Sequence, residues 1–218
     1  MHKLIRYYSY HWFKLNIYLI IILAICLLLF WNDLEPLRRI LCLSLGALFI
    51  YQFEEYQLPG GGPVVINKGN FGEKEYWRTY PGNMLSSMIV NNSAWLVYIV
   101  AIIEDQWLWL GLGTMFFNLF QIIGHGIKMN KGMHTWYNPG LLSTLICFLP
   151  VSIFYFKYAI AAGCSATDWL LGAVAFILLL LLTTILPVQL LKDRNSAYPM
   201  PQWQIDRCDK VQRFASLR

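Results

Sequence analysis

Six long apolar stretches alternate with short polar segments along the chain. They cover about residues 14–31, 39–57, 84–103, 107–127, 141–161 and 169–191. A hydrocarbon core about 30 Å thick is crossed by roughly 20 apolar residues in a helix, so each stretch predicts a membrane-spanning helix. The pattern therefore predicts an all-α fold, a polytopic integral membrane protein whose six-helix transmembrane bundle forms a single domain over residues 1–218.

The composition agrees with this pattern. Hydrophobic residues make up 57% of the chain and charged residues only 13%, which excludes a water-soluble globule, where charged residues are roughly a quarter. The first apolar stretch is followed by the charged segment NDLEPLRR and no small-residue cleavage site, so we expect it to remain in the mature protein. The five cysteines form no CxxC pair and indicate neither a disulfide framework nor a thiolate metal site.

Basic residues predict the orientation in the membrane, because lysine and arginine in short loops resist translocation. Fourteen of the 17 lie in the two tails and in the segments 58–83 and 128–140, whereas Arg38, Arg39 and Lys157 lie on the other side. We therefore expect a multi-pass protein of the plasma (inner) membrane with both termini in the cytoplasm. The net charge of +5 then reflects the orientation of the protein in the membrane. We expect membrane lipids, and not nucleic acid, as its partners.

Polar side chains in two of the predicted spans form stripes. Tyr51, Glu54 and Glu55 share one face of the second span, and Asn118, Gln121 and His125 share one face of the fourth. At about 1.5 Å per residue, Glu55 and His125 lie roughly 24 and 27 Å below the starts of their spans, so they can meet near the cytoplasmic boundary. We therefore expect the two stripes to line a polar pocket that opens toward the cytoplasmic side. Two further polar side chains, Asn91 and Asn92 of the third span, could cover this pocket.

Structural explanations exist for each of these residues. The two glutamates could be a solvated helix end, His125 could be a hydrogen-bonded core histidine, and the amides could join helices by hydrogen bonds. Ionisable groups at membrane depth are nevertheless functional candidates, and here they occur at compatible depths. The 128–140 segment adds His134 and a turn that begins with Tyr137.

These residues resemble a known family, the HXXEE-domain membrane proteins of bacteria and archaea, whose activity is unassigned. The matching features are the glutamate pair with the Pro-Gly turn after Tyr56, His125, and the YxPG element formed by Tyr137, Pro139 and Gly140. The chain departs from the motif at one position, because Tyr51 stands where the family has its first histidine. The resemblance supplies no reaction.

Two carboxylates and an imidazole suit a divalent metal such as zinc, manganese or iron. We expect Glu55 and His125 as ligands, Glu54 as a third ligand or as the general base, and His134 as a further ligand if its loop folds back. The side chains of adjacent glutamates point about 100° apart around a helix. An arrangement in which one glutamate binds the ion and the other supports it is therefore geometrically easier than one in which both bind. Without a metal, the glutamate pair could share a proton beside His125 and serve in acid–base chemistry.

The sequence has no GxSxG, HExxH, P-loop or GxGxxG motif. We expect an integral-membrane, metal-dependent hydrolase or transferase that acts on a lipid or lipid-linked substrate at the cytoplasmic leaflet. The alternatives are a small transporter or binding protein that uses the same polar cluster for an ion or small molecule, and a non-catalytic accessory protein. A transporter should show inverted repeats and broken midplane helices, neither of which is evident, whereas the loss of a histidine at Tyr51 favours a non-catalytic protein.

Overall fold

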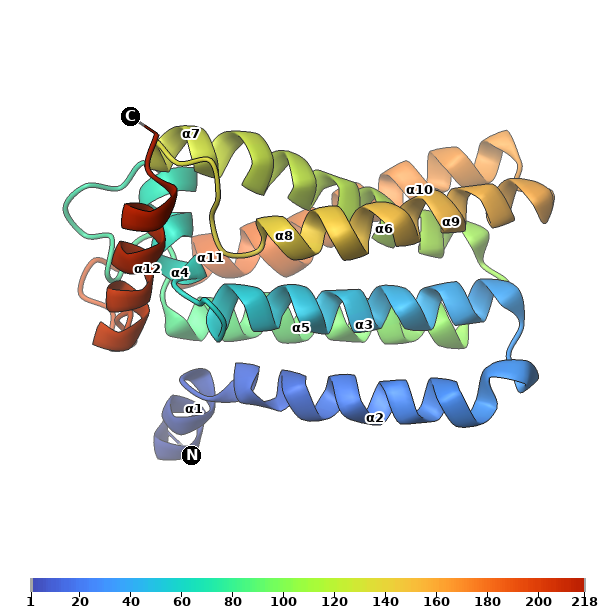
Figure 1. The fold of residues 1–218 in the computed structure, drawn as a ribbon, viewed down its shortest axis with the longest axis horizontal. Coiled ribbons are helices and arrows are strands. Elements are labelled where there is room, and N and C mark those ends of the chain that lie inside the picture. Colours follow the sequence, from blue (N-terminus) through green and yellow to red (C-terminus); the bar gives the residue numbers. More distant parts are fainter. Residues whose placement is uncertain (1, 218) are drawn as a thin grey trace.

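Long helical rods dominate the computed structural model, which describes residues 2–217 (Figure 1). Some rods change from α to 3-10 or π geometry along their length without breaking. In chain order the six rods are Trp12–Asp33, Pro36–Tyr56, Met84–Ile103, Leu108–Met133, Leu141–Ala161 and Ala166–Leu191. The second and third rods are single helices, α3 (Pro36–Tyr56) and α5 (Met84–Ile103). The first rod consists of η1 (Trp12–Lys14), α2 (Leu15–Phe30) and η2 (Trp31–Asp33), the fourth of α6 (Leu108–Ile123), η4 (Gly124–Met129) and α7 (Asn130–Met133), the fifth of α8 (Leu141–Ser143), η5 (Thr144–Phe148) and α9 (Leu149–Ala161), and the sixth of α10 (Ala166–Leu179), η6 (Leu180–Ile185) and α11 (Leu186–Leu191). The predicted all-α fold is confirmed.

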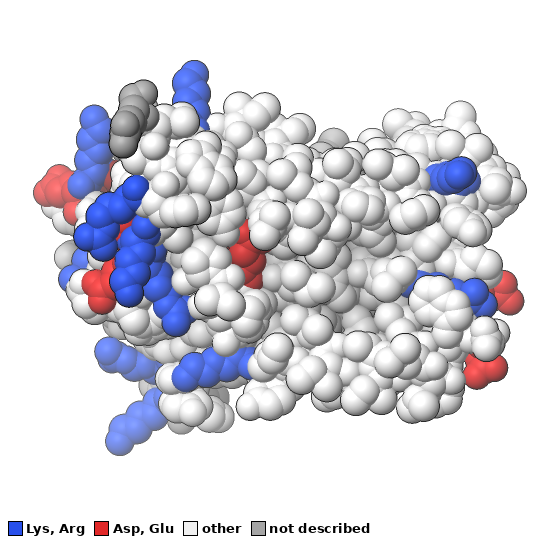
Figure 2. Space-filling model, in the orientation of Figure 1, with Lys and Arg blue, Asp and Glu red and all other residues white. Residues whose placement is uncertain are grey.

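Five of these rods are long and apolar enough to cross a membrane. The exception among the described residues is α3, whose ends carry Arg38, Arg39, Glu54 and Glu55. Apolar side chains face outward along the rods, and Leu28 on α2 is 83% exposed. Figure 2 shows the result on one face of the molecule, a broad uncharged band between two charged ends. Such a surface suits a lipid environment and supports the predicted polytopic membrane fold.

The rods run up and down along the long axis of the molecule, so the chain begins and ends on the same side (Figure 1). This side also holds the segments 58–83 and 134–140, and we call it the basic end, because Lys and Arg side chains gather there (Figure 2). The opposite end holds Arg38, which forms a salt bridge of 2.8 Å with Asp105. An even number of rods explains why both tails are found together.

Two boundaries differ from the sequence prediction. The fourth rod does not end near residue 127 but continues to Met133, because Met129 and Met133 are buried against the basic end. The predicted 128–140 loop is therefore only 134–140. The long 58–83 segment also contains helix, namely α4 (Gly62–Val65) followed by the π-helical turn η3 (Ile66–Asn70).

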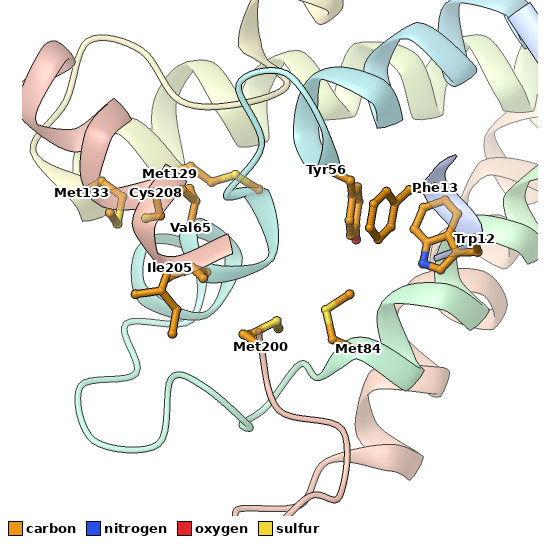
Figure 3. Close-up of a cluster of buried hydrophobic side chains, with 11 residues drawn as sticks. Trp12, Phe13, Tyr56, Val65, Met84, Met129, Met133, Met200, Ile205 and Cys208 are labelled. Carbon is orange, nitrogen blue, oxygen red and sulfur yellow. The ribbon is translucent and has the colours of Figure 1, made fainter. Parts of the chain in front are cut away.

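The two tails pack on the bundle as helices. They form α1 (His2–Ser9) and α12 (Gln202–Ala215). Beneath α12 lies a cluster of buried side chains drawn from the C-terminal tail, the 58–83 segment and four rods (Figure 3). Its labelled members are Trp12, Phe13, Tyr56, Val65, Met84, Met129, Met133, Met200, Ile205 and Cys208. This cluster fixes the basic end, next to which the candidate site lies.

Candidate functional site

His125 lies in the π-helical part of the fourth rod and is completely buried. Its Nδ1 is 2.6 Å from Oδ1 of Asn138. The amide nitrogen of Asn138 donates to the backbone oxygen of His125 at 2.8 Å and to Oδ1 of Asn130 at 2.7 Å. Because both amide protons are used in this way, Oδ1 must accept the proton on Nδ1. The neutral ring therefore presents the lone pair of Nε2 to the interior of the bundle.

Tyr51 and Glu55, one turn apart on α3, face that lone pair. The phenol oxygen of Tyr51 is 2.8 Å from Nε2, and Oε1 of Glu55 is 3.6 Å from it. The second distance is too long for a hydrogen bond, and Oε1 of Glu55 is buried with no hydrogen-bond partner among the described residues. A buried carboxylate oxygen in this state costs free energy unless a ligand or a proton satisfies it.

Gly140 allows the turn after the fourth rod to approach this group closely. Its φ of 104° lies in the left-handed region, and a Cβ atom there would be 2.5 Å from Cε1 of His125 and 2.9 Å from Cε2 of Tyr51. Only glycine fits both the backbone conformation and the space. The YxPG element identified in the sequence therefore closes the site from one side.

Glu54 points away from His125 and binds the beginning of the fifth rod. Its two carboxylate oxygens accept hydrogen bonds from the phenol of Tyr137 at 2.7 Å and from the backbone N–H groups of Leu142 at 3.2 Å and Ser143 at 2.7 Å. These N–H groups belong to the first turn of a helix, where they have no partner within the helix and attract negative charge. Burial and this hydrogen bond to Glu54 raise the pKa of Tyr137, which keeps its phenol protonated as a donor.

The predicted amides lie elsewhere and join helices. Asn118 accepts from Tyr98 at 2.6 Å and donates to Ser44 at 3.1 Å. Asn91 donates to the phenol of Tyr56 at 3.0 Å, and Asn92 donates to that of Tyr8 at 2.8 Å. Gln121 is half-exposed. The structural explanation, interhelical hydrogen bonding, thus describes the three asparagines better than a shared pocket does.

The predicted set of four metal ligands, Glu54, Glu55, His125 and His134, does not assemble. Within residues 2–217, no three His, Cys, Asp or Glu side chains come close enough to hold one ion. Only Glu55 and His125 meet. Glu54 turns to the fifth rod because neighbouring residues of a helix point about 100° apart, and His134 is exposed in a left-handed conformation at the end of α7.

A groove runs beside the site at the surface of the basic end. It has a volume of about 580 Å³, and α12, the turn after α3 and the 134–140 segment form its walls. Leu58, Pro59, Val211 and Phe214 make the walls apolar, and Lys210 and Tyr137 are their polar members. Because the phenol of Tyr137 donates to Glu54, the groove leads from the surface to the outer edge of the carboxylate pair.

Residues 42–155, more than half of the chain, match the model of a family described as proteins of unknown function with an HXXEE motif. The chain belongs to this family. The matched region includes most of α3 with the glutamate pair, the fourth rod with His125, and the 134–140 segment with Pro139 and Gly140. No curated protein and no solved structure matches the chain.

The family motif places histidine three residues before the glutamate pair, and this chain has Tyr51 there. Tyr51 nonetheless occupies the centre of the site, in contact with His125. Asn138, which determines the tautomer of His125, was not among the predicted site residues. The only signal for it was an amide next to Pro139 and Gly140 in a turn expected near His125.

Proposed function

We propose that this HXXEE protein is a membrane-embedded, metal-dependent hydrolase or transferase that acts on a lipid or lipid-linked substrate at the cytoplasmic leaflet. One observation carries the proposal. The unpartnered Oε1 of buried Glu55 and the lone pair of Nε2 of His125 face each other at 3.6 Å. A cation would satisfy Oε1 of Glu55 and would take the lone pair of Nε2 in place of the hydrogen bond from Tyr51.

The separation of these two atoms suits a metal ion. Ligands bound at 2.0–2.2 Å on a tetrahedral ion lie about 3.3–3.6 Å from each other. The phenol oxygen of Tyr51, 2.8 Å from Nε2, is a third possible ligand, and Asn138 is the kind of partner that fixes the tautomer of a ligating histidine. Zinc, manganese or iron in this position would act as a Lewis acid and would activate a bound water.

The groove supports the substrate class. Its apolar walls fit a hydrocarbon chain, and Lys210 at the groove would attract a negatively charged headgroup. The basic end faces the cytoplasm by the distribution of lysine and arginine, and the plasma membrane is the expected location. Tyr137 then stands between the substrate and the carboxylate pair, where its single O–H donates to Glu54 and holds that carboxylate beside the groove.

The test is the metal content of the detergent-purified protein from cells grown with ample zinc, iron and manganese. We expect bound metal in the natural protein and none in Glu55→Gln or His125→Ala, because each variant loses one of the two facing ligands. Glu54→Gln is the matched control, since it removes the neighbouring charge but leaves both facing atoms in place. Full occupancy in both ligand variants, or no metal in the natural protein, would refute the proposal.

The hydrogen bond between Tyr51 and His125 favours a second candidate, a non-catalytic accessory protein. In the structure the phenol lies 2.8 Å from Nε2 and so occupies the lone pair that a metal requires. On this account the buried network only holds α3 to the fourth and fifth rods, as polar groups do in other membrane bundles. The natural protein would then contain no metal.

A further inference from the structure

A second pocket at the basic end lies apart from the glutamate pair, between the beginning of the first rod and α12. Its volume is about 620 Å³. The walls come from three parts of the chain, Phe13 and Lys14 of η1, Phe53 and Gln57 near the end of α3, and Trp203 and Arg207 of α12. The N-terminal segment and the C-terminal helix therefore form one binding surface.

Two cations line this pocket without a carboxylate partner. The guanidinium of Arg207 lies 5.0 Å from the ring centre of Trp203 and donates one N–H to the backbone oxygen of Gln57, which leaves further donors free. Lys14 is exposed. The salt bridges of residues 2–217, within 4.0 Å, are Arg38–Asp105 and His125–Glu55, so both cations of the pocket remain available to an anion.

The pocket lies where charged and lipid-facing surfaces meet. Lys14 directly precedes α2, on which Ile17, Tyr18 and Ile21 are exposed apolar or aromatic side chains. A phosphate held in the pocket would thus have an apolar helix surface beside it for acyl chains. Basic pockets between helices at the cytoplasmic boundary bind the headgroups of anionic lipids by this combination of charge and apolar contact.

We propose that this pocket binds the phosphate of an anionic phospholipid, with Arg207 and Lys14 as its charge partners and Trp203 at the lipid boundary. This lipid ties the two tails together and is independent of any reaction at Glu55 and His125. A free phosphate ion offers the same charge without acyl chains, so the experiment must separate the two sources.

The test compares phosphatidylglycerol with phosphatidylcholine by titration into the full-length protein in neutral detergent, with bound lipid counted by native mass spectrometry. We expect phosphatidylglycerol to bind more tightly than phosphatidylcholine. Lys14→Gln and Arg207→Gln should each weaken the binding of phosphatidylglycerol about fivefold, which corresponds to the loss of one cation near the surface. Arg213→Gln, an exposed position on the same helix but outside the pocket, is the matched control.

Several results would overturn the assignment. Equal weakening by Arg213→Gln would mean that the whole basic surface attracts the lipid, and equal binding of phosphatidylcholine would remove the role of charge. Displacement of phosphatidylglycerol by millimolar inorganic phosphate would identify a free phosphate site instead. Since Arg207 also binds the backbone, Lys14→Gln decides the outcome if Arg207→Gln fails to fold, because the Lys14 side chain is exposed.

Discussion

Glu54 and Glu55 are neighbours in the chain, but their carboxyl groups contact different parts of the molecule. Glu55 faces the Nε2 atom of His125, whereas Glu54 accepts hydrogen bonds from the beginning of the fifth rod. The cause is the helical rotation of about 100° per residue, which directs adjacent side chains to different neighbours. One glutamate thus supplies the unsatisfied atom of the site, and the other holds in place the turn that covers it.

Glu54→Gln should destabilise the protein without removing a metal from Glu55 and His125. An amide nitrogen cannot accept from the N–H of Ser143, and the variant also loses the attraction between a carboxylate and a helix N-terminus. We expect a loss of about 1–2 kcal/mol, measured as a lower melting temperature in detergent. Glu75→Gln, in the exposed part of the 58–83 segment, should leave the melting temperature unchanged. Equal melting temperatures for the two variants would contradict this role.

Tyr51→His should strengthen metal binding because it restores the histidine of the family motif beside Glu55 and Nε2 of His125. Tyr51→Phe is the matched control, since it keeps the ring and removes only the phenol oxygen. Metal titration of the stripped proteins measures both. We expect Tyr51→His to bind the metal more tightly than the natural protein does, and Tyr51→Phe to show no such gain. A gain of equal size in both variants would show that Tyr51 merely blocks Nε2.

Residue depth could be predicted from the sequence, but side-chain direction could not. The lengths of the second and fourth spans placed Glu55 and His125 at the same level, and the structure brings them to 3.6 Å. The partner of Glu54 depends on where the fifth rod begins, which α3 alone does not determine. Asn138 contacts His125 only because the 134–140 segment folds back on the fourth rod, a tertiary contact that no local pattern indicates.

Apolar stretches predicted the existence of the rods better than their ends. The prediction ended the fourth rod at a run of glycine and lysine, but Met129 and Met133 are buried and extend it by tertiary packing. The same rod contains two glycines, Gly111 and Gly113, at close contacts with neighbouring rods. A Cβ on Gly111 would meet Tyr155 of the fifth rod, and one on Gly113 would meet Ala175 of the sixth. Small residues let neighbouring helices approach closely.

Gly111→Ala should therefore destabilise the bundle. The new methyl group would lie 2.0 Å from the phenol oxygen of Tyr155 and would displace a buried ring that hydrogen-bonds to Leu108. Overpacking of this kind costs about 1–3 kcal/mol. Gly124→Ala is the control on the same rod, because nothing lies within 4 Å of its added Cβ and alanine favours a helix. Thermal unfolding in detergent should rank Gly111→Ala well below Gly124→Ala, and the reverse ranking would contradict the packing argument.

At the scale of the whole molecule, the helical architecture and the shared location of the termini followed from the number of apolar stretches. The cluster beneath α12 did not, since it joins residues from Trp12 to Cys208 that no sequence pattern connects (Figure 3). The same cluster also affects how the orientation can be measured. Cys208 is buried, and burial raises the pKa of its thiol to about 11, so it would react with a maleimide on neither side of a membrane.

We also predict that the basic end faces the cytoplasm, because thirteen of the 16 lysines and arginines among residues 2–217 lie there. The exposed position Ser216, replaced by cysteine in a Cys164→Ser background, reports on that end. A membrane-impermeant maleimide should label Ser216→Cys only after the cells are permeabilised. The natural Cys164, which is partly exposed in the turn between α9 and α10 at the opposite end, should be labelled in intact cells. Labelling of Ser216→Cys in intact cells would reverse the orientation and would place the groove, the lipid pocket and the Glu55–His125 pair at the outer leaflet.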